Sequence, residues 1–189
     1  MRRIAVRIGS APTSLYWYVS DKNELYELMA DAVIGEIELP GRPSGDWRAD
    51  LASTAWATLA TGRRHPWFAQ LGIHPVPGPQ TIRYAQAATR SLESLGLEEA
   101  AEINILAALN NYIYGFLQRE TAWRQLTSRT GPATAGSATS LAGRAPQGGR
   151  ALTATSLAAR TRLAGEESFA FGLNLLLDGI AALVAQAGE

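Results

Sequence analysis

The chain has 189 residues, a formal net charge of zero and no cysteine. This length suits one or two small domains with a sizeable core, and the lack of cysteine excludes disulfides and thiolate sites and fits a reducing cytosol. A signal peptide and a membrane span are not expected, because the first arginines lead into an amphipathic run and the most apolar stretch, residues 169–184, is short and contains Asn174 and Asp178.

The first eighteen residues predict two short helices joined by a turn. In the first, over residues 2–8, two isoleucines lie four apart on an inward face, which leaves the arginines free. Gly9 permits the left-handed backbone that ends a helix, and Pro12 suits the start of the next helix, over residues 13–18. This pattern is a helix-turn-helix, so double-stranded DNA is the first partner to consider.

The second helix is rich in aromatic and hydroxyl side chains. Leu15 and Val19 are expected to face inward, and exposed aromatics on so short a helix are costly unless a partner covers them. Hydroxyl groups can donate to phosphate oxygens, and an indole can lie along a sugar or a thymine methyl. The candidate DNA-binding residues are Arg2, Arg3, Thr13, Ser14, Tyr16, Trp17, Tyr18 and Lys22. The plainer alternative is a small helical domain whose aromatics form its core.

A third helix, the connector, is expected to begin at Asp21. Asp21 with Glu24 resembles a capping box. Lys22 then lies in the first turn, where the helix dipole disfavours a cation unless a phosphate is bound beside it.

The string RRIAVRIGSAPTSLYWYVSDKNELYELM resembles the DNA-binding motif of TetR-family transcriptional repressors, with the strongest matches at Arg2, Ile4, Ala5, Gly9, the run from Leu15 to Val19, Lys22 and Leu25. The resemblance implies a bacterial, cytoplasmic protein that lies on the nucleoid when it is bound to DNA. It implies that Arg2 faces the major groove and that Thr13 and Ser14 begin the recognition helix. It further implies that Tyr16, Tyr18 and Lys22 contact the DNA backbone and that Trp17 contacts a base or a sugar.

Members of the family carry a longer helix ahead of this motif, whereas this chain starts at the second helix. Losing a helix that covers Ile4, Ile8 and Leu15 would cost several kcal/mol, at roughly 1.5–3 kcal/mol per buried large side chain. Either the natural start lies upstream of Met1, or this form is truncated. We expect weak or absent operator binding by this chain, and the alternative function is a helical dimer or truncated regulator with little DNA binding. A mobility-shift titration with and without the upstream residues separates these.

The rest of the chain predicts further helices and no convincing strand. They are expected at residues 25–37, 46–64, 66–71, 81–95, 98 to about 127 and 166–187, with breaks at the proline- and glycine-rich residues 40–45 and 74–79. The fold class is therefore all-α. Residues 1–39 are expected to form the truncated helix-turn-helix head with its connector helix, and residues 46–189 a helical ligand-binding and dimerisation domain.

The last helix is apolar on more than one side, which is typical of a buried helix. One stripe of it comprises Phe169, Leu173, Leu176, Ile180 and Leu183. The phrase FAFGLNLLLDGIAAL resembles the closing helix of tetracycline-repressor-like C-terminal domains, which implies that this stripe forms the interface of a homodimer. Ordinary core within one chain is the alternative. A dimer would hold two reading heads roughly 34–36 Å apart, one turn of DNA.

A pocket for a small hydrophobic effector is expected between the helices of the body. Its candidate lining residues are Trp56, Leu59, Phe68, Leu71, Ile82, Leu106, Asn110, Ile113 and Leu117, and plain core is the alternative for each. Gln70 and Glu38 fall where the tetracycline repressor has drug-binding histidines, so magnesium–tetracycline is not expected as the ligand. His65 and His74 each precede a proline and are expected to mark helix or loop edges, so no metal or other cofactor is expected. An effector that prefers the DNA-free state would shift the connector helix and release the operator.

Two further observations bound the function. Residues 121–165 contain six arginines and no acidic residue, so about 127–162 is expected to be a flexible segment; a basic arm and a reading-frame slip are the alternatives. The sequence has no glycine-rich phosphate loop, histidine–carboxylate metal motif or serine elbow, so an enzyme is not expected.

Overall fold

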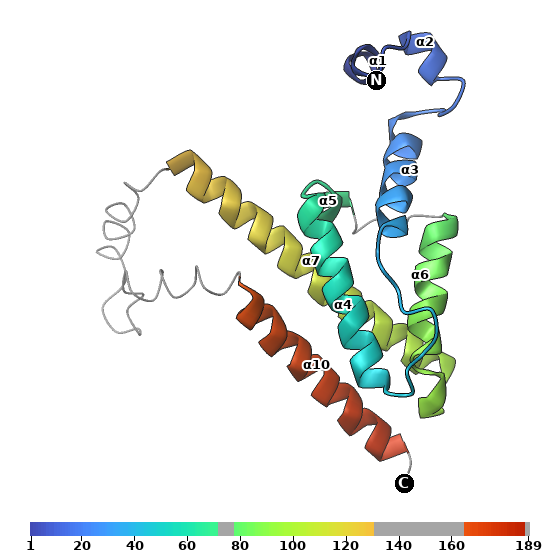
Figure 1. The fold of residues 1–189 in the computed structure, drawn as a ribbon, viewed down its shortest axis with the longest axis vertical. Helices are drawn as coiled ribbons and strands as arrows, with labels where there is room; N and C mark the ends of the chain where they lie inside the picture. Colours follow the sequence, from blue (N-terminus) through green and yellow to red (C-terminus); the bar gives the residue numbers. More distant parts are fainter. Residues whose placement is uncertain (72–77, 131–164, 188–189) are drawn as a thin grey trace. The chain divides into compact units, whose positions relative to one another are not determined.

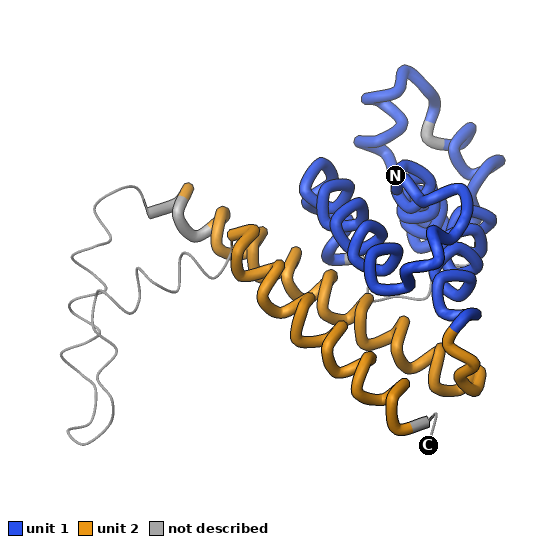
Figure 2. The backbone as a smooth tube through the Cα atoms, turned by 60° about the horizontal axis from the view of Figure 1, so that its bottom comes forward, with its two compact units in different colours: residues 1–94 blue, residues 95–189 orange. Residues whose placement is uncertain are grey.

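The computed structural model describes residues 1–71, 78–130 and 165–187 of the chain. Within these residues every regular element is a helix, which confirms the all-α fold class (Figure 1). The chain divides into two compact units, residues 1–94 and residues 95–189 (Figure 2). The first unit contains the head, the connector helix and three helices of the body, and the second contains the two longest helices.

The head consists of α1 (Arg2–Arg7) and α2 (Pro12–Leu15). Gly9 ends α1 with a φ of 70°, and the amide of Ser10 donates to the carbonyl of Ala5 at 2.9 Å. The second helix is shorter than the predicted residues 13–18, because the chain turns at residues 16–18 instead of completing a second helical turn.

The connector helix is α3 (Lys22–Gly35). The carboxylate of Asp21 accepts hydrogen bonds from the amides of Asn23 at 2.7 Å and Glu24 at 2.9 Å, which satisfies two of the free donors of the first turn. The carboxylate of Glu24 accepts from the amide and the hydroxyl of Ser20, and these bonds lower its pKa. The half of the predicted capping box that Asp21 supplies thus forms, whereas Glu24 reaches back to Ser20 instead of to the amide of Asp21.

The rest of the first unit comprises α4 (Trp47–Arg64), α5 (Phe68–Leu71), α6 (Pro79–Arg90) and the 3₁₀ turn η1 (Glu93–Leu95). Asp46 is the N-cap of α4, and its carboxylate accepts from the amides of Arg48 and Ala49. The single helix predicted at 81–95 is instead α6 followed by the 3₁₀ turn. The fully buried side chains of this unit are mostly apolar and include Ile37, Leu51, Leu59, Phe68 and Leu92.

The second unit consists of α7 (Glu99–Thr130) and α10 (Glu166–Ala187), which lie side by side (Figures 1 and 2). Phe169 stacks on Tyr112 with ring centroids 5.3 Å apart and meets Phe116 edge-on at 5.1 Å. The Tyr112 hydroxyl donates to the carbonyl of Phe169 at 2.8 Å. Aromatic packing and this hydrogen bond therefore hold α10 on α7.

The end of α7 and the segment that follows it can be compared with the sequence expectations. The helix predicted to stop near residue 127 continues to Thr130, and the rest of the segment predicted to be flexible, residues 131–162, lies outside the described residues.

In the described part of the chain, residues Glu166–Gln186 are long and apolar enough to cross a membrane, with a mean hydropathy of 1.8. The buried Phe169, Leu173 and Leu177 on this helix fit the packing of a core helix equally well.

Candidate functional site

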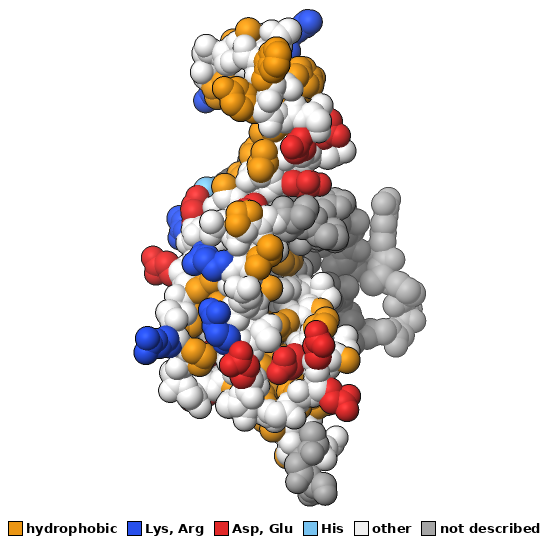
Figure 3. Space-filling model, turned by 90° about the vertical axis from the view of Figure 1, so that its right-hand side faces the viewer, with side chains coloured by type: hydrophobic (Ala, Val, Ile, Leu, Met, Phe, Trp, Pro, Cys, Tyr) orange, Lys and Arg blue, Asp and Glu red, His pale blue; other side chains and the backbone are white. Residues whose placement is uncertain are grey.

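The structure places the candidate DNA-binding residues on the surface of the head. Tyr16, Trp17 and Tyr18 are 54%, 88% and 83% exposed in the turn after α2. Leu15 and Val19, on either side of them, are buried and fix the turn from inside. Arginine and lysine side chains border the apolar groups of the head, which is at the top of Figure 3.

The remaining candidates of the head are also accessible. Arg2, Arg3, Thr13 and Lys22 are exposed, and Ser14 is half-buried. The ammonium of Lys22 lies 4.9 Å from the centre of the Tyr26 ring, one turn further along α3. The arrangement therefore offers hydroxyls, guanidinium groups and flat aromatic rings, which are the groups that contact phosphate, base edges and sugar.

The apolar face of α1 differs from the expectation. The sequence predicts Ile4 and Ile8 to face inward, but Ile4 is half-buried and Ile8 is 62% exposed. Only Ala5 of this helix is buried. A hollow of about 420 Å³ lies over the same helix, lined by Arg3, Ile4, Arg7 and Ile8.

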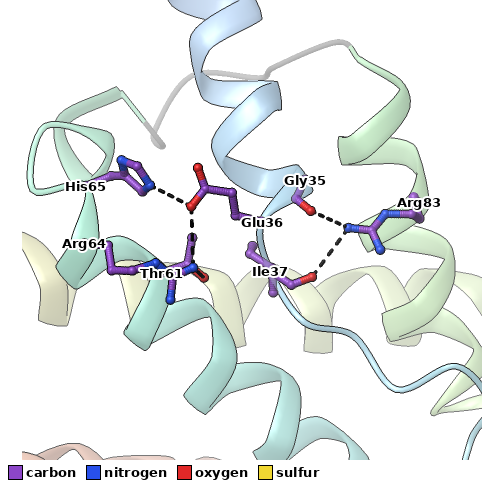
Figure 4. A network of polar contacts seen from close by, with 7 residues as sticks. All are labelled: Gly35, Glu36, Ile37, Thr61, Arg64, His65 and Arg83. Carbon is purple, nitrogen blue, oxygen red and sulfur yellow. Dashed lines mark hydrogen bonds and ion pairs between the residues drawn. The ribbon is translucent and has the colours of Figure 1, made fainter.

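A polar network surrounds the end of the connector helix (Figure 4). Glu36, the C-cap of α3, accepts a hydrogen bond from Nε2 of His65 at 2.8 Å and pairs with Arg64 at 3.5 Å. The hydrogen bond with His65 is the main cause that lowers the pKa of Glu36. His65, expected to mark a helix edge, is the C-cap of α4. The network thus ties the end of the connector helix to the end of α4.

The candidate pocket residues are distributed over both units. In the first unit Leu59 and Phe68 are fully buried, Trp56 is half-buried and Ile82 is 58% exposed. In the second unit Ile113 and Leu117 are buried, whereas Leu106 and Asn110 are half-buried; the side chain of Leu71 lies outside what the structure describes. A pocket formed by these residues stays a prediction.

Sequence reasoning missed a row of buried hydroxyls in the first unit. Thr54, Thr58 and Thr61 of α4 are at most 2% exposed, and the Thr58 hydroxyl lies 3.3 Å from that of Tyr84 on α6. Burial raises the pKa of Tyr84, so the phenol stays neutral at physiological pH. The helical spacing of the threonines was the available signal, but their side chains favour loops and caps as readily as a core.

The predicted dimer stripe of α10 is largely buried within the chain. Phe169, Leu173 and Ile180 are at most 8% exposed, Leu176 is half-buried and Leu183 is 44% exposed.

A different apolar face of the second unit is exposed. It comprises Phe171 and Leu175 of α10, with Leu183 of the predicted stripe at its edge, between 44% and 69% exposed, and we call it the α10 outer face. A groove of about 450 Å³ runs between the two helices next to it. The groove is lined by Ala101, Asn104, Ile105, Ala108, Leu109, Leu175, Leu176, Gly179, Ile180 and Leu183.

Comparisons with known proteins agree with one another. Residues 39–184 match the family of tetracyclin repressor-like C-terminal domains. The HTH-type transcriptional repressor DrrR1 of Streptomyces coeruleorubidus is 32% identical over 191 residues, which cover 98% of this chain and 71% of that protein. An HTH-type transcriptional regulator of Saccharopolyspora erythraea is 36% identical over 129 residues, or 66% of this chain and about half, 53%, of that protein.

Solved structures show the same likeness. The TetR family protein ActR of Streptomyces coelicolor, solved in complex with actinorhodin, superposes with a TM-score of 0.71 at 25% identity, over 100% of this chain and 88% of that one. The family match covers more than half of the chain, and one relative above 30% identity is matched over more than two thirds of its length. The chain therefore belongs to the TetR family of transcriptional regulators.

Proposed function

We propose that the protein is a one-component repressor, which binds a palindromic operator as a dimer and releases it when a small hydrophobic molecule binds. The observation that carries the proposal is the exposure of Tyr16, Trp17 and Tyr18 between the buried Leu15 and Val19. Large apolar rings presented together on a small surface indicate a partner that covers them. The repressor DrrR1, similar along nearly the whole chain, supports DNA as that partner.

The roles of the head residues follow from their chemistry. Tyr16 and Tyr18 donate to phosphates, while Trp17 lies on a sugar or a base. The arginines of α1 neutralise the backbone or read a base edge, and Lys22 meets a phosphate at the start of α3, where the helix dipole also attracts an anion.

The dimer is assigned to the α10 outer face. An isologous interface uses the same patch on both subunits, and the α10 outer face is an apolar patch that is exposed in the described part of the chain. The stripe containing Phe169 and Leu173 is occupied by α7 of the same chain, so its role in the dimer is to hold α10 in place.

The effector is proposed to enter the body near the buried hydroxyl row. ActR, a structural relative, has been solved in complex with actinorhodin and in complex with (S)-DNPA. An apolar lining with a few polar anchors is the usual composition of such sites, and Thr58 and Tyr84 are suitable anchors. We place the protein in the bacterial cytoplasm, on the nucleoid while it is bound to an operator.

A selection experiment tests the DNA-binding function. The full chain, with and without upstream residues restored ahead of the motif, is incubated with random duplexes, and the bound fractions are sequenced. The enriched sequence is then titrated by mobility shift, and the chain without those residues is expected to bind it more weakly. We expect a palindrome bound with steep salt dependence, because phosphate contacts release counterions. Trp17→Ala is expected to weaken binding at least about five-fold, at about 1–3 kcal/mol for a lost base contact.

The control for this selection is Leu28→Ala, which truncates a leucine that is 53% exposed on α3, outside the head. It is expected to bind the palindrome like the unchanged protein. Enrichment of no duplex, or equal affinity of the Trp17→Ala variant, would favour the alternative of a helical dimer without operator binding. Thermal shift with actinorhodin then tests the effector class, with a rise in Tm expected for a bound compound.

A further inference from the structure

The N-terminus of α6 is capped by a side chain of another helix. Its own N-cap is Gly78, which has no side chain to offer, and Pro79 has no amide hydrogen. The buried carboxylate of Asp31, on α3, accepts from the amides of Gln80 at 3.3 Å and Thr81 at 2.9 Å and from the Thr81 hydroxyl at 3.0 Å. An acid of the connector helix thus satisfies the free donors of the first turn of α6.

The C-terminus of α3 is capped in return by α6. The guanidinium of Arg83 donates to the carbonyls of Gly35 at 3.2 Å and Ile37 at 3.4 Å, as Figure 4 shows. Its Nε donates to the side-chain oxygen of Gln80 at 3.1 Å, which orients the group. The acid therefore lies at the positive end of one helix dipole and the base at the negative end of the other.

Two glycines allow the close approach that this arrangement needs. A Cβ atom at Gly78 would lie 2.2 Å from Cγ of Asp31, and one at Gly35 would lie 3.1 Å from Cγ of Gln80. The first distance is far below van der Waals contact with a side chain held by three hydrogen bonds. Any other residue at position 78 would therefore displace the Asp31 cap.

The same helix also reaches the interior of the unit. Tyr84 follows Arg83 directly in the sequence, is buried, and meets Thr58 of α4 through its hydroxyl. A molecule that displaces Tyr84 moves the backbone that carries Arg83, and with it the cap on the connector helix.

We infer that Asp31 and Arg83 are positioning residues, which join α3 and α6 into one reciprocally capped pair and pass any displacement of α6 to the reading head. The part of the inference that concerns the reading head rests on the proposed function. The rigid coupling of the two helices is a property of the protein alone. A purely local role would have each side chain stabilise only the helix end that it contacts.

Hydrogen exchange of the full chain separates the two roles. Asp31→Asn and Arg83→Met are compared with the unchanged protein and with two controls, Glu38→Gln and Arg90→Gln, whose side chains are exposed on or next to the same helices. Exchange is measured for peptides that cover residues 30–38 and 78–86. We expect each capping variant to raise exchange at least about five-fold in both peptides, as for loss of a helix cap, and the controls to leave both unchanged.

An increase confined to the peptide that holds the contacted amides or carbonyls overturns the inference. Gly78→Ala is the second variant, since it displaces Asp31 without removing its charge, and it must reproduce the two-peptide response. Circular dichroism checks that each variant stays folded.

The operator experiment completes the test. Asp31→Asn is expected to weaken binding to the selected palindrome about five- to ten-fold, and unchanged affinity overturns the inference while leaving the proposed function intact. If the protein selects no duplex either with or without the upstream residues restored, the proposed function fails and the exchange result alone decides the coupling.

Discussion

Glu36 illustrates how one exposed carboxylate can tie two helices together. It ends α3 and accepts a hydrogen bond from His65 at the end of α4, while Arg64 adds a longer ion pair. Each contact is solvent-accessible and therefore individually weak. These contacts matter because of their position: they join the connector helix to α4 at the point where the chain leaves α3.

The stability that Glu36 contributes should depend on pH. Its pKa in the folded protein is lowered below the ordinary value of 4.5, mainly by the hydrogen bond with His65. A carboxylate with a depressed folded pKa stabilises the protein above its unfolded pKa, and the contribution is lost as the pH falls through the folded pKa. We expect the Tm difference between the unchanged protein and Glu36→Gln to be largest above pH 4.5 and to shrink below it.

Thermal unfolding followed by circular dichroism between pH 7 and pH 3 measures this difference, with Glu38→Gln as the matched loss of an exposed carboxylate nearby. A Tm difference that grows on acidification would contradict the assignment, because it would require the opposite shift of the pKa.

At the scale of single elements, the two capping aspartates provide a comparison. Asp21 and Asp46 each accept from two amides of the following first turn, one at the connector helix and the other at α4. Replacing either with alanine should cost about 1 kcal/mol of stability. Only Asp21→Ala should also weaken operator binding, because α3 begins beside the head. Denaturant titration and mobility shift measure the two effects, and equal operator affinities of the two variants would contradict the prediction.

The pairing of α7 and α10 depends on the space that Gly172, which has no side chain, leaves for the Tyr112 ring. A Cβ atom there would lie 2.5 Å from the Tyr112 hydroxyl, which is held by its hydrogen bond and by the stacked Phe169 ring. Gly172→Ala should therefore destabilise the protein by about 1–3 kcal/mol, the usual cost of overpacking. Gly115→Ala on α7, where a Cβ would meet nothing within 4 Å, should be neutral or stabilising.

Denaturant titration of both glycine variants checks this, and a double variant with Tyr112→Leu should recover part of the loss. Similar stabilities of the Gly172→Ala and Gly115→Ala variants would show that the packing of α10 on α7 does not require a glycine at position 172.

What the sequence predicts well is local, and what it misses depends on distant residues. The caps at Asp21 and Asp46 could be predicted because donor and acceptor lie within three residues. The cap at Thr81 could not, since Asp31 lies 50 positions earlier in the chain. The inward face of α10 was equally out of reach, because several sides of this helix are apolar and only the packing of Phe169 on α7 decides which is covered.

At the scale of the whole molecule, we propose that the α10 outer face joins two chains, so that their reading heads act together. Its apolar side chains, Phe171 at 69% and Leu175 at 57% exposure among them, are expected to be covered in the dimer. A charge placed there would have to be buried without a partner, which costs several kcal/mol. Leu175→Glu should therefore convert the dimer to a monomer in analytical ultracentrifugation.

Operator affinity should fall with the dimer, because a monomer presents one head to a two-fold site and loses the effective concentration of the second. Leu28→Glu is the matched control: it places the same charge on a leucine of α3 with 53% exposure, so the dimer should persist. A Leu175→Glu variant that stays dimeric would move the interface to another face. A monomer that keeps full operator affinity would remove the need for paired heads, and with it the reason to expect a palindromic site.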